Sequence, residues 1–186
     1  RYAVISVALS HMVMVSVMSM TPVHMQDMGY DLVVVGFTIS LHIAGMYALS
    51  PIMGMLADRF GKIRMIVIGQ LTYLAALATA GFGNDNRWLV TLGLALLGLG
   101  WSASTVSGSA LLASVLPANE KTNVQGLSDS LMNLSGALGG GVAGTILSFV
   151  AFGGLNMFAL LPVTVISLLS IVAYRKSIAV EVIPAK

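Results

Sequence analysis

Long apolar runs separated by short polar connections make up most of the chain. A bilayer with a hydrocarbon core of about 30 Å requires about 20 mostly apolar residues in a helix to cross it. Six runs are long enough, and their expected bounds are 3–23, 32–57, 65–82, 88–116, 124–150 and 155–174. The pattern therefore predicts an all-α membrane protein in which residues 1–186 form a single six-span transmembrane domain.

Composition supports the membrane assignment. Of the 186 residues, 57% are hydrophobic and 9% are charged, whereas about 25% are charged in an average soluble domain. The first run carries only Arg1 as a basic flank and has no small-x-small cleavage site, so it is read as a span and not as a signal peptide. The chain has no cysteine, which excludes disulfides, thiolate catalysis and cysteine-ligated metals.

The basic residues indicate how the predicted spans are oriented. Lysine and arginine in short loops favour the cytoplasmic side of a membrane. Eight basic residues fall on one side of the predicted topology and only Arg87 on the other; the eight are Arg1, Arg59, Lys62, Arg64, Lys121, Arg175, Lys176 and Lys186. This bias predicts a multi-pass protein of the plasma (inner) membrane with both termini in the cytoplasm. The pI of about 9.1 then reflects orientation among membrane lipids, and no nucleic-acid partner is predicted.

One charged stretch, "GMLADRFGKIRM" at residues 54–65, lies between two apolar runs. It resembles the signature loop of the major facilitator superfamily, G-x-L-A-D-[RK]-x-G-[RK]-[RK]-x-[RK], which joins the second and third helices of each six-helix half. The matching residues are Gly54, Leu56, Ala57, Asp58, Arg59, Gly61 and Lys62. Ile63 and Met65 depart from the pattern, and Arg64 supplies a basic residue one place away.

The resemblance implies a fold and a function. It implies half of a twelve-span secondary transporter, made of two inverted three-helix repeats, that moves a small molecule by alternating access. The partner would be the other six-helix half or a second copy of the chain. The loop would act as a cytoplasmic gating motif made of Gly54, Asp58, Arg59, Gly61, Lys62 and Arg64.

The residue types of this loop also have a physical interpretation of their own. Gly54 would let one helix end approach another closely, and Gly61 would permit a sharp turn. Asp58 stands where a carboxylate could accept hydrogen bonds from the amides of a helix N-terminus.

Two further stretches bear on the kind of carrier. The fourth run has Leu94 about where an N-terminal half of a proton-coupled carrier often has an arginine, so the C-terminal half is favoured. "GALGGGVAGT" partly resembles the antiporter motif G-x-x-x-G-P-x-x-G-G, matching at Gly136, Gly140 and Gly144. Export is therefore mildly favoured. The alternative is ordinary helix packing through small residues at every fourth position.

Ionisable residues inside membrane spans are candidates for a functional site. His42 lies about 15 Å into the second run, near the midplane, and His11 reaches a similar depth from the other side. Either imidazole could carry a coupling proton or bind a substrate. Trp101 in the fourth run could line a cavity and is a further candidate. The alternative is a neutral histidine hydrogen-bonded to a neighbouring helix.

Asp129 and Asn133 lie one helical turn apart at the start of the fifth run and should face the same way. They are predicted to be partners of the gating loop. The alternative for Asp129 is an acidic residue in the first turn of a helix, where the helix dipole favours it.

Other functions have weaker support. Met12, Met14, Met18 and Met20 suggest Cu(I), but residues at i and i+2 do not share a helix face, so no metal and no cofactor are predicted. "GWSA" in the fourth run superficially resembles a rhomboid-type intramembrane serine protease. Ser102 would need a histidine from the sixth run, which has none, so no enzymatic activity is predicted. A transport-inactive membrane assembly or sensor protein would share the same fold.

Overall fold

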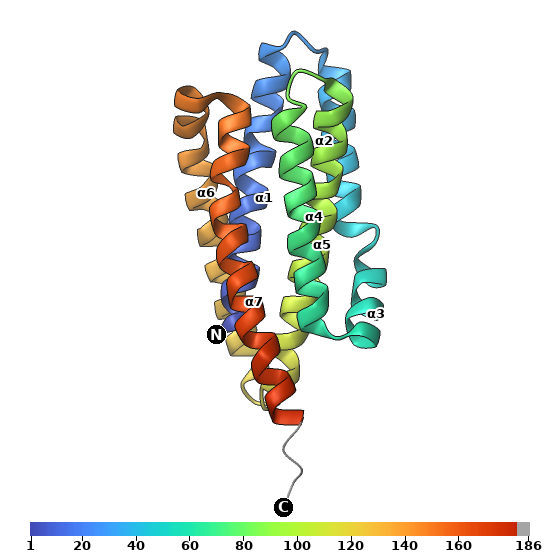
Figure 1. The fold of residues 1–186 in the computed structure, drawn as a ribbon, viewed down its shortest axis with the longest axis vertical. Helices are drawn as coiled ribbons and strands as arrows, with labels where there is room; N and C mark the ends of the chain where they lie inside the picture. The colour runs from blue at the N-terminus through green and yellow to red at the C-terminus, as the bar shows by residue number, and fades with distance from the viewer. Residues whose placement is uncertain (182–186) are drawn as a thin grey trace, which may run out of the picture.

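The computed structural model describes the backbone of residues 1–181 and the side chains of residues 1–176. All regular secondary structure in this part is helical, and the helices form one elongated bundle (Figure 1). Their bounds are α1 Tyr2–Asp27, α2 Leu32–Tyr47, α3 Ser50–Phe60, α4 Lys62–Phe82, α5 Arg87–Val115, α6 Lys121–Phe158 and α7 Leu160–Glu181. The expected all-α membrane fold is confirmed.

The expected second run is broken into α2 and α3 at Ala48 and Leu49. Pro51 stands in the first turn of α3, where it has no N–H to donate to the carbonyl of Tyr47 four residues earlier. The hydroxyl of Ser50 donates to that carbonyl instead, at 2.8 Å. The proline thus explains the break, and the serine satisfies the carbonyl that the break would leave unpaired.

The expected fifth and sixth runs are joined by helix. α6 continues to Phe158, but Ala151 has φ 56° and ψ −176°, which is not helical, so the helix bends sharply there. α7 then runs back toward the opposite end of the bundle (Figure 1) and packs against α1 and α4. By length and composition, five segments of the described chain could span a membrane, and the fifth, Lys121–Lys176, contains α6 and most of α7 in 56 residues.

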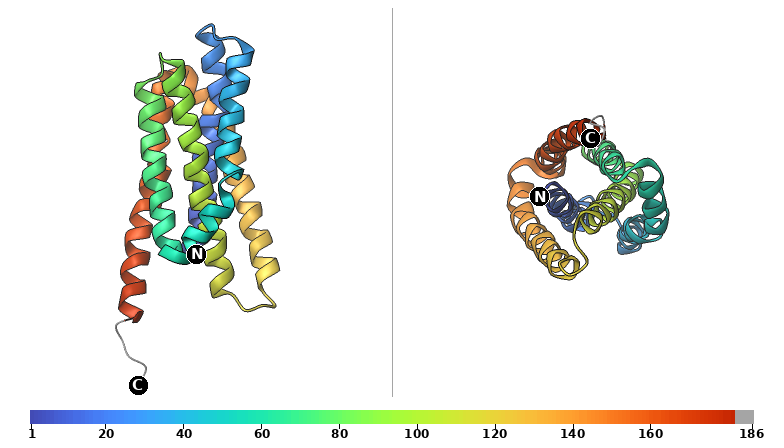
Figure 2. Two further views of the ribbon diagram at one scale, coloured as in Figure 1. Left: turned by 90° about the vertical axis from the view of Figure 1, so that its right-hand side faces the viewer. Right: turned by 90° about the horizontal axis from the view of Figure 1, so that it is seen from below.

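α1 and α5 occupy the middle of the bundle, with α6 and α7 on one side and α2 and α3 on the other (Figure 2). α4 packs on α5 and also contacts α7. A large apolar core forms where these helices meet, and its fully buried members include Tyr73, Leu94, Leu97 and Phe152.

Glycine allows a very close contact between α2 and α5. A Cβ atom on Gly98 of α5 would lie 2.3 Å from the carbonyl oxygen of His42 on α2. Only glycine fits such an approach, so this position brings the two backbones together.

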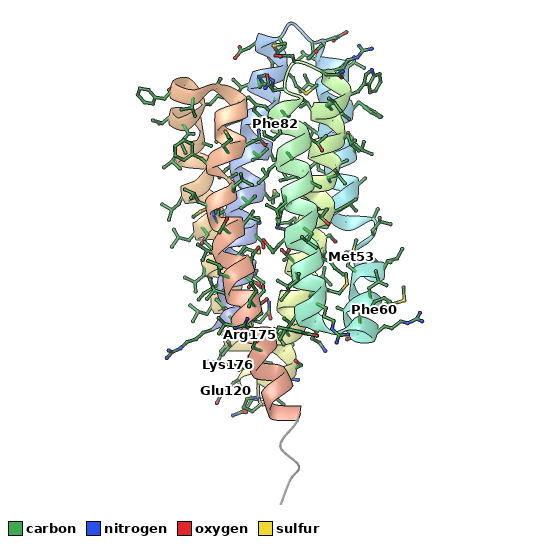
Figure 3. All side chains as sticks on the ribbon, in the orientation of Figure 1. Met53, Phe60, Phe82, Glu120, Arg175 and Lys176 are labelled. Atoms are coloured by element: carbon green, nitrogen blue, oxygen red, sulfur yellow. The ribbon has the colours of Figure 1, made fainter. Side chains whose placement is uncertain are left out.

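One end of the bundle carries most of the basic residues. Arg1 and the last turn of α7 lie at the same end as the α3–α4 turn, and Figure 3 labels Phe60, Arg175 and Lys176 there, with Phe82 near the other end. We call this the basic end. Lys186, the last residue counted in the charge bias, lies outside the described residues.

Candidate functional site

The charged turn between α3 and α4 forms the first part of the candidate site. Gly61 has φ 100°, a conformation that side chains disfavour, so the sharp turn depends on this glycine as expected. We expected Gly54 to allow close approach of a second helix, but the structure shows no such approach. A Cβ atom there would lie 3.8 Å from a Val106 methyl group, which is ordinary contact distance.

We expected Asp58 to accept hydrogen bonds from amides at a helix N-terminus, but it does not cap a helix. α4 begins at Lys62 with Gly61 as its N-cap residue and no side-chain cap. The Asp58 carboxylate lies 3.5 Å from the Lys62 ammonium, and its side chain is 76% exposed. The turn thus holds a loose ion pair whose carboxylate stays accessible from outside the bundle.

An open depression of ≈ 490 Å³ lies against this turn. Its wall includes Arg64, whose guanidinium donates to the Tyr174 hydroxyl at 3.2 Å and lies 5.7 Å from the centre of the Tyr174 ring. Tyr174 belongs to α7, so Arg64 links α4 to α7. Arg59 and Lys62 line the same depression.

We expected Asp129 and Asn133 to be partners of the gating loop, but the structure describes no contact between them and the charged turn. Gln125 donates to the Asp129 carboxylate at 3.1 Å, and the Asn133 amide donates to the Asp129 carbonyl at 2.8 Å, so both residues bond within α6. The first-turn alternative for Asp129 is wrong, since α6 begins at Lys121, two turns earlier. Both side chains are exposed.

His42 lies between α2 and α5 and is fully buried. Its Nδ1 lies 2.8 Å from the carbonyl oxygen of Leu94. A carbonyl only accepts, so Nδ1 carries the hydrogen, and Nε2 is left as an acceptor that is buried without a partner among the described residues. Thr38, one turn away, pairs with Thr91 of α5 at 2.7 Å.

His11 and Trp101 are brought together by the fold. The indole Nε1 of Trp101 donates to His11 Nδ1 at 3.0 Å. The other face of His11 packs on α6, because a Cβ atom on Gly136 would lie 2.9 Å from His11 Nε2. Tyr47 of α2 meets Trp101 edge to face at 5.7 Å. We call His11, Trp101 and Tyr47 the aromatic cluster. Sequence reasoning missed Tyr47, since nothing in its spacing points to Trp101.

Sequence reasoning also did not identify a buried polar group around Gln70. The Gln70 amide of α4 donates to the Ser104 hydroxyl of α5 at 2.9 Å and reaches the Ser10 hydroxyl of α1 at 3.5 Å. The Tyr73 hydroxyl donates to the Ser10 carbonyl at 2.8 Å. Gln70 interrupts an otherwise apolar run, which was the available signal. These bonds join α1, α4 and α5.

The α6 glycines lie along α1. Cβ atoms on Gly136 and Gly140 would lie 2.5 and 3.1 Å from His11 and Val15, whereas one on Gly144 would meet Met20 only at 3.8 Å. Gly139, which is not one of the matching motif positions, is closely packed as well, since a Cβ atom there would lie 2.6 Å from the Ser16 hydroxyl.

The serine-protease alternative gains no support, since the Ser102 hydroxyl is buried without any hydrogen-bond partner in the described part of the chain.

A bundle of long apolar helices, with polar groups buried between them and most basic residues at one end, defines a multi-pass membrane protein. The chain belongs to the major facilitator superfamily, because the model of that family matches residues 3–182.

Relatives of known sequence agree with this family. The chain is 40% identical over 164 residues to the uncharacterized MFS-type transporter YdeG of Bacillus subtilis (strain 168). The aligned region covers 84% of this chain and 38% of the relative. It is 39% identical over 145 residues to the uncharacterized MFS-type transporter YddS of the same organism, covering 77% and 33%. It is 35% identical over 91 residues to the multidrug resistance protein MdtH of Shigella dysenteriae serotype 1 (strain Sd197), covering 49% and 22%. The chain thus spans a third or somewhat more of the length of the first two relatives.

Proposed function

We propose that the chain forms one six-helix half of a secondary transporter that moves a small molecule across the inner membrane by alternating access. The family and the covered share of its relatives support this assignment. In this proposal α2 with α3 forms one span, and α6 and α7 form two, with the basic end in the cytoplasm. The C-terminal half remains the favoured one.

The surface of α6 carries the proposal. Most of its exposed residues between positions 126 and 145 form two neighbouring stripes, one small or polar and one apolar, roughly 90° apart at about 100° per residue. The first stripe consists of Gly126, Ser130, Asn133, Ala137, Gly141 and Thr145, and the second of Leu127, Leu131, Leu134, Leu138 and Val142. Lipid suits only the second stripe, since polar groups are costly in hydrocarbon and small residues are typical of helix contacts. The small stripe therefore supports contact with another protein half.

The aromatic cluster is the proposed substrate contact. Tyr47 is 59% exposed although it touches the buried Trp101, so its ring is available to a ligand at the surface of the bundle. The cluster joins α1, α2 and α5 and lies against α6. A second half that packs on the small stripe would enclose this cluster between the halves.

His42 and His11 are the proposed proton-coupling residues, with different consequences for the structure. A proton on His42 would be added at Nε2, which leaves its bond to Leu94 intact. A proton on His11 would be added at Nδ1, which breaks the bond from Trp101. His11 therefore couples protonation to movement of the aromatic cluster more directly. Likeness to a multidrug resistance protein supports outward transport, because a transporter lowers the concentration of a toxic compound in the cell by exporting it.

The proposal is tested by the surface of α6. A Cβ atom added to Gly141 would have no neighbouring atom within 4 Å, so Gly141→Leu should leave the folding of this chain unchanged. It should abolish transport in the complete carrier, measured in vesicles with a panel of fluorescent small molecules, because the bulky side chain separates the halves. Val142→Leu on the neighbouring apolar stripe is the matched control and should transport normally.

Two outcomes would contradict this assignment. One is normal transport by Gly141→Leu at equal membrane abundance. The other is flux through vesicles that contain this chain as a verified monomer, because alternating access requires two halves around a shared site. Flux by the monomer would also remove the need for a partner.

A further inference from the structure

The depression beside the α3–α4 turn is lined by charged residues of the gating motif together with side chains of α5 and α7. Its volume is ≈ 490 Å³, and residues from α3, α4, α5 and α7 line it. Three basic side chains, Arg59, Lys62 and Arg64, face one acidic side chain, Asp58. The excess of positive charge suits an anion.

Arg64 is held in place at the wall of the depression. Its bond to the Tyr174 hydroxyl and its position over the Tyr174 ring restrict its movement. A guanidinium has five N–H donors, so a single bond to a hydroxyl leaves most of them for a second acceptor. Arginine in such a fixed position binds phosphate with two parallel hydrogen bonds.

The apolar surface below Arg64 indicates the source of the phosphate. Exposed residues of α4 recur at helical spacing directly from Arg64 along the helix: Ile68, Leu71, Ala75, Ala78 and Phe82. Spacings of three and four residues place them on one face. Ile68 is 45% exposed and Leu71 59%. This apolar stripe begins where the basic depression ends.

The depression also lies at the end of the bundle where anionic lipid would be met. Phe60, Arg175 and Lys176 are exposed at this end (Figure 3). Basic clusters just outside membrane helices are attracted to anionic lipids of the cytoplasmic leaflet. A free phosphate ion would use the depression but would have no use for the apolar stripe beside it.

We propose that the depression binds the phosphodiester headgroup of an anionic phospholipid, with one acyl chain lying on the α4 stripe. Arg64 donates to the phosphate oxygens, and Arg59 and Lys62 neutralise its charge. The glycerol lies near the first turn of α4, and the chain follows Ile68 and Leu71. This site is distinct from the aromatic cluster and does not depend on transport.

Native mass spectrometry of the purified protein tests the site. Phosphatidylglycerol should be retained at lower lipid concentration than phosphatidylcholine. The double variant Lys62→Gln/Arg64→Gln should weaken retention of phosphatidylglycerol by roughly 5- to 30-fold, the factor expected for one to two basic side chains at an anionic lipid surface. The double variant Arg87→Gln/Lys121→Gln removes the same charge outside the depression and should bind as the parent does.

Each other result overturns the proposal. Equal retention of the two lipids by the parent protein would show that charge recognition is absent, and this comparison needs no variant to fold. Equal losses in the two double variants would indicate a general charge effect. Displacement of phosphatidylglycerol by millimolar inorganic phosphate would indicate an anion site without a lipid chain.

Discussion

At the residue scale, a side chain's partner decides its role more than its type does. His42 and His11 are both histidines at similar predicted depth, yet one bonds to a backbone carbonyl and the other accepts from an indole. The first is held between two helices, and the second belongs to the partly exposed aromatic cluster. The sequence singled out both residues, but their different surroundings come from α5, which supplies both partners.

Asp58 gives a prediction at this scale. Its described partner is Lys62, and an exposed ion pair of this kind contributes only about 0.2–1 kcal/mol. Asp58→Asn should therefore leave folding and membrane abundance nearly unchanged. Transport by the complete carrier should nevertheless fall about 5- to 150-fold. As part of the proposed gate, Asp58 would make a charge-assisted contact of about 1–3 kcal/mol in one of the alternating conformations, and its loss would shift their balance.

The matched control is Asp85→Asn, which removes one carboxylate near the opposite end of the bundle and should transport normally. Uptake or efflux is measured in vesicles at equal protein content. Parent-like transport by Asp58→Asn would mean that the charged turn serves orientation alone.

At the element scale, proline accounts for the break between α2 and α3, and glycine accounts for the close contact between α2 and α5. Hydropathy predicted neither feature. Pro51 divides the second span, whereas Pro22 lies inside α1 without ending it, so the sequence did not say which proline would interrupt a helix. The contact between α2 and α5 depends on Gly98, but twenty glycines occur in the chain and the sequence does not say which of them meet a backbone.

Two glycine variants test this contact. Gly98→Ala should destabilise the protein by about 1–3 kcal/mol, because the new methyl group would meet the His42 carbonyl oxygen and force the helices apart. Gly36→Ala in α2 has nothing within 4 Å of the new methyl group and should be neutral or stabilising by up to about 1 kcal/mol. Thermal unfolding in detergent, followed by circular dichroism, compares them. Equal melting temperatures would show that the close approach is not a packing constraint.

At the scale of the whole molecule, orientation rests on the charge bias. Arg1, the α3–α4 turn and the last turn of α7 do lie at one end of the bundle (Figure 1). That arrangement is compatible with the predicted topology, in which this end faces the cytoplasm because basic residues resist translocation.

Single cysteines test the orientation without interference, since the chain contains none. Asp27→Cys and Asp85→Cys should react with an impermeant maleimide added to intact cells, and Ile63→Cys should react only after the membrane is permeabilised. Labelling is measured by a mass shift on gels. Reaction of Ile63→Cys in intact cells would reverse the proposed topology.

The sequence by itself determined the membrane class, the helical runs, the family resemblance and the turn at Gly61. These follow from local properties, namely apolar length, charge position and backbone freedom, which act within one segment. Only the tertiary structure decided that Trp101 bonds to His11, that Gln70 bridges to Ser104, and that Asp129 stays within its own helix. Such pairs join segments far apart in the chain, and their geometry depends on how each helix is rotated about its axis. Because nearly every face of each helix carries apolar residues, hydropathy does not specify that rotation. It is specified by glycine contacts and buried hydrogen bonds between helices.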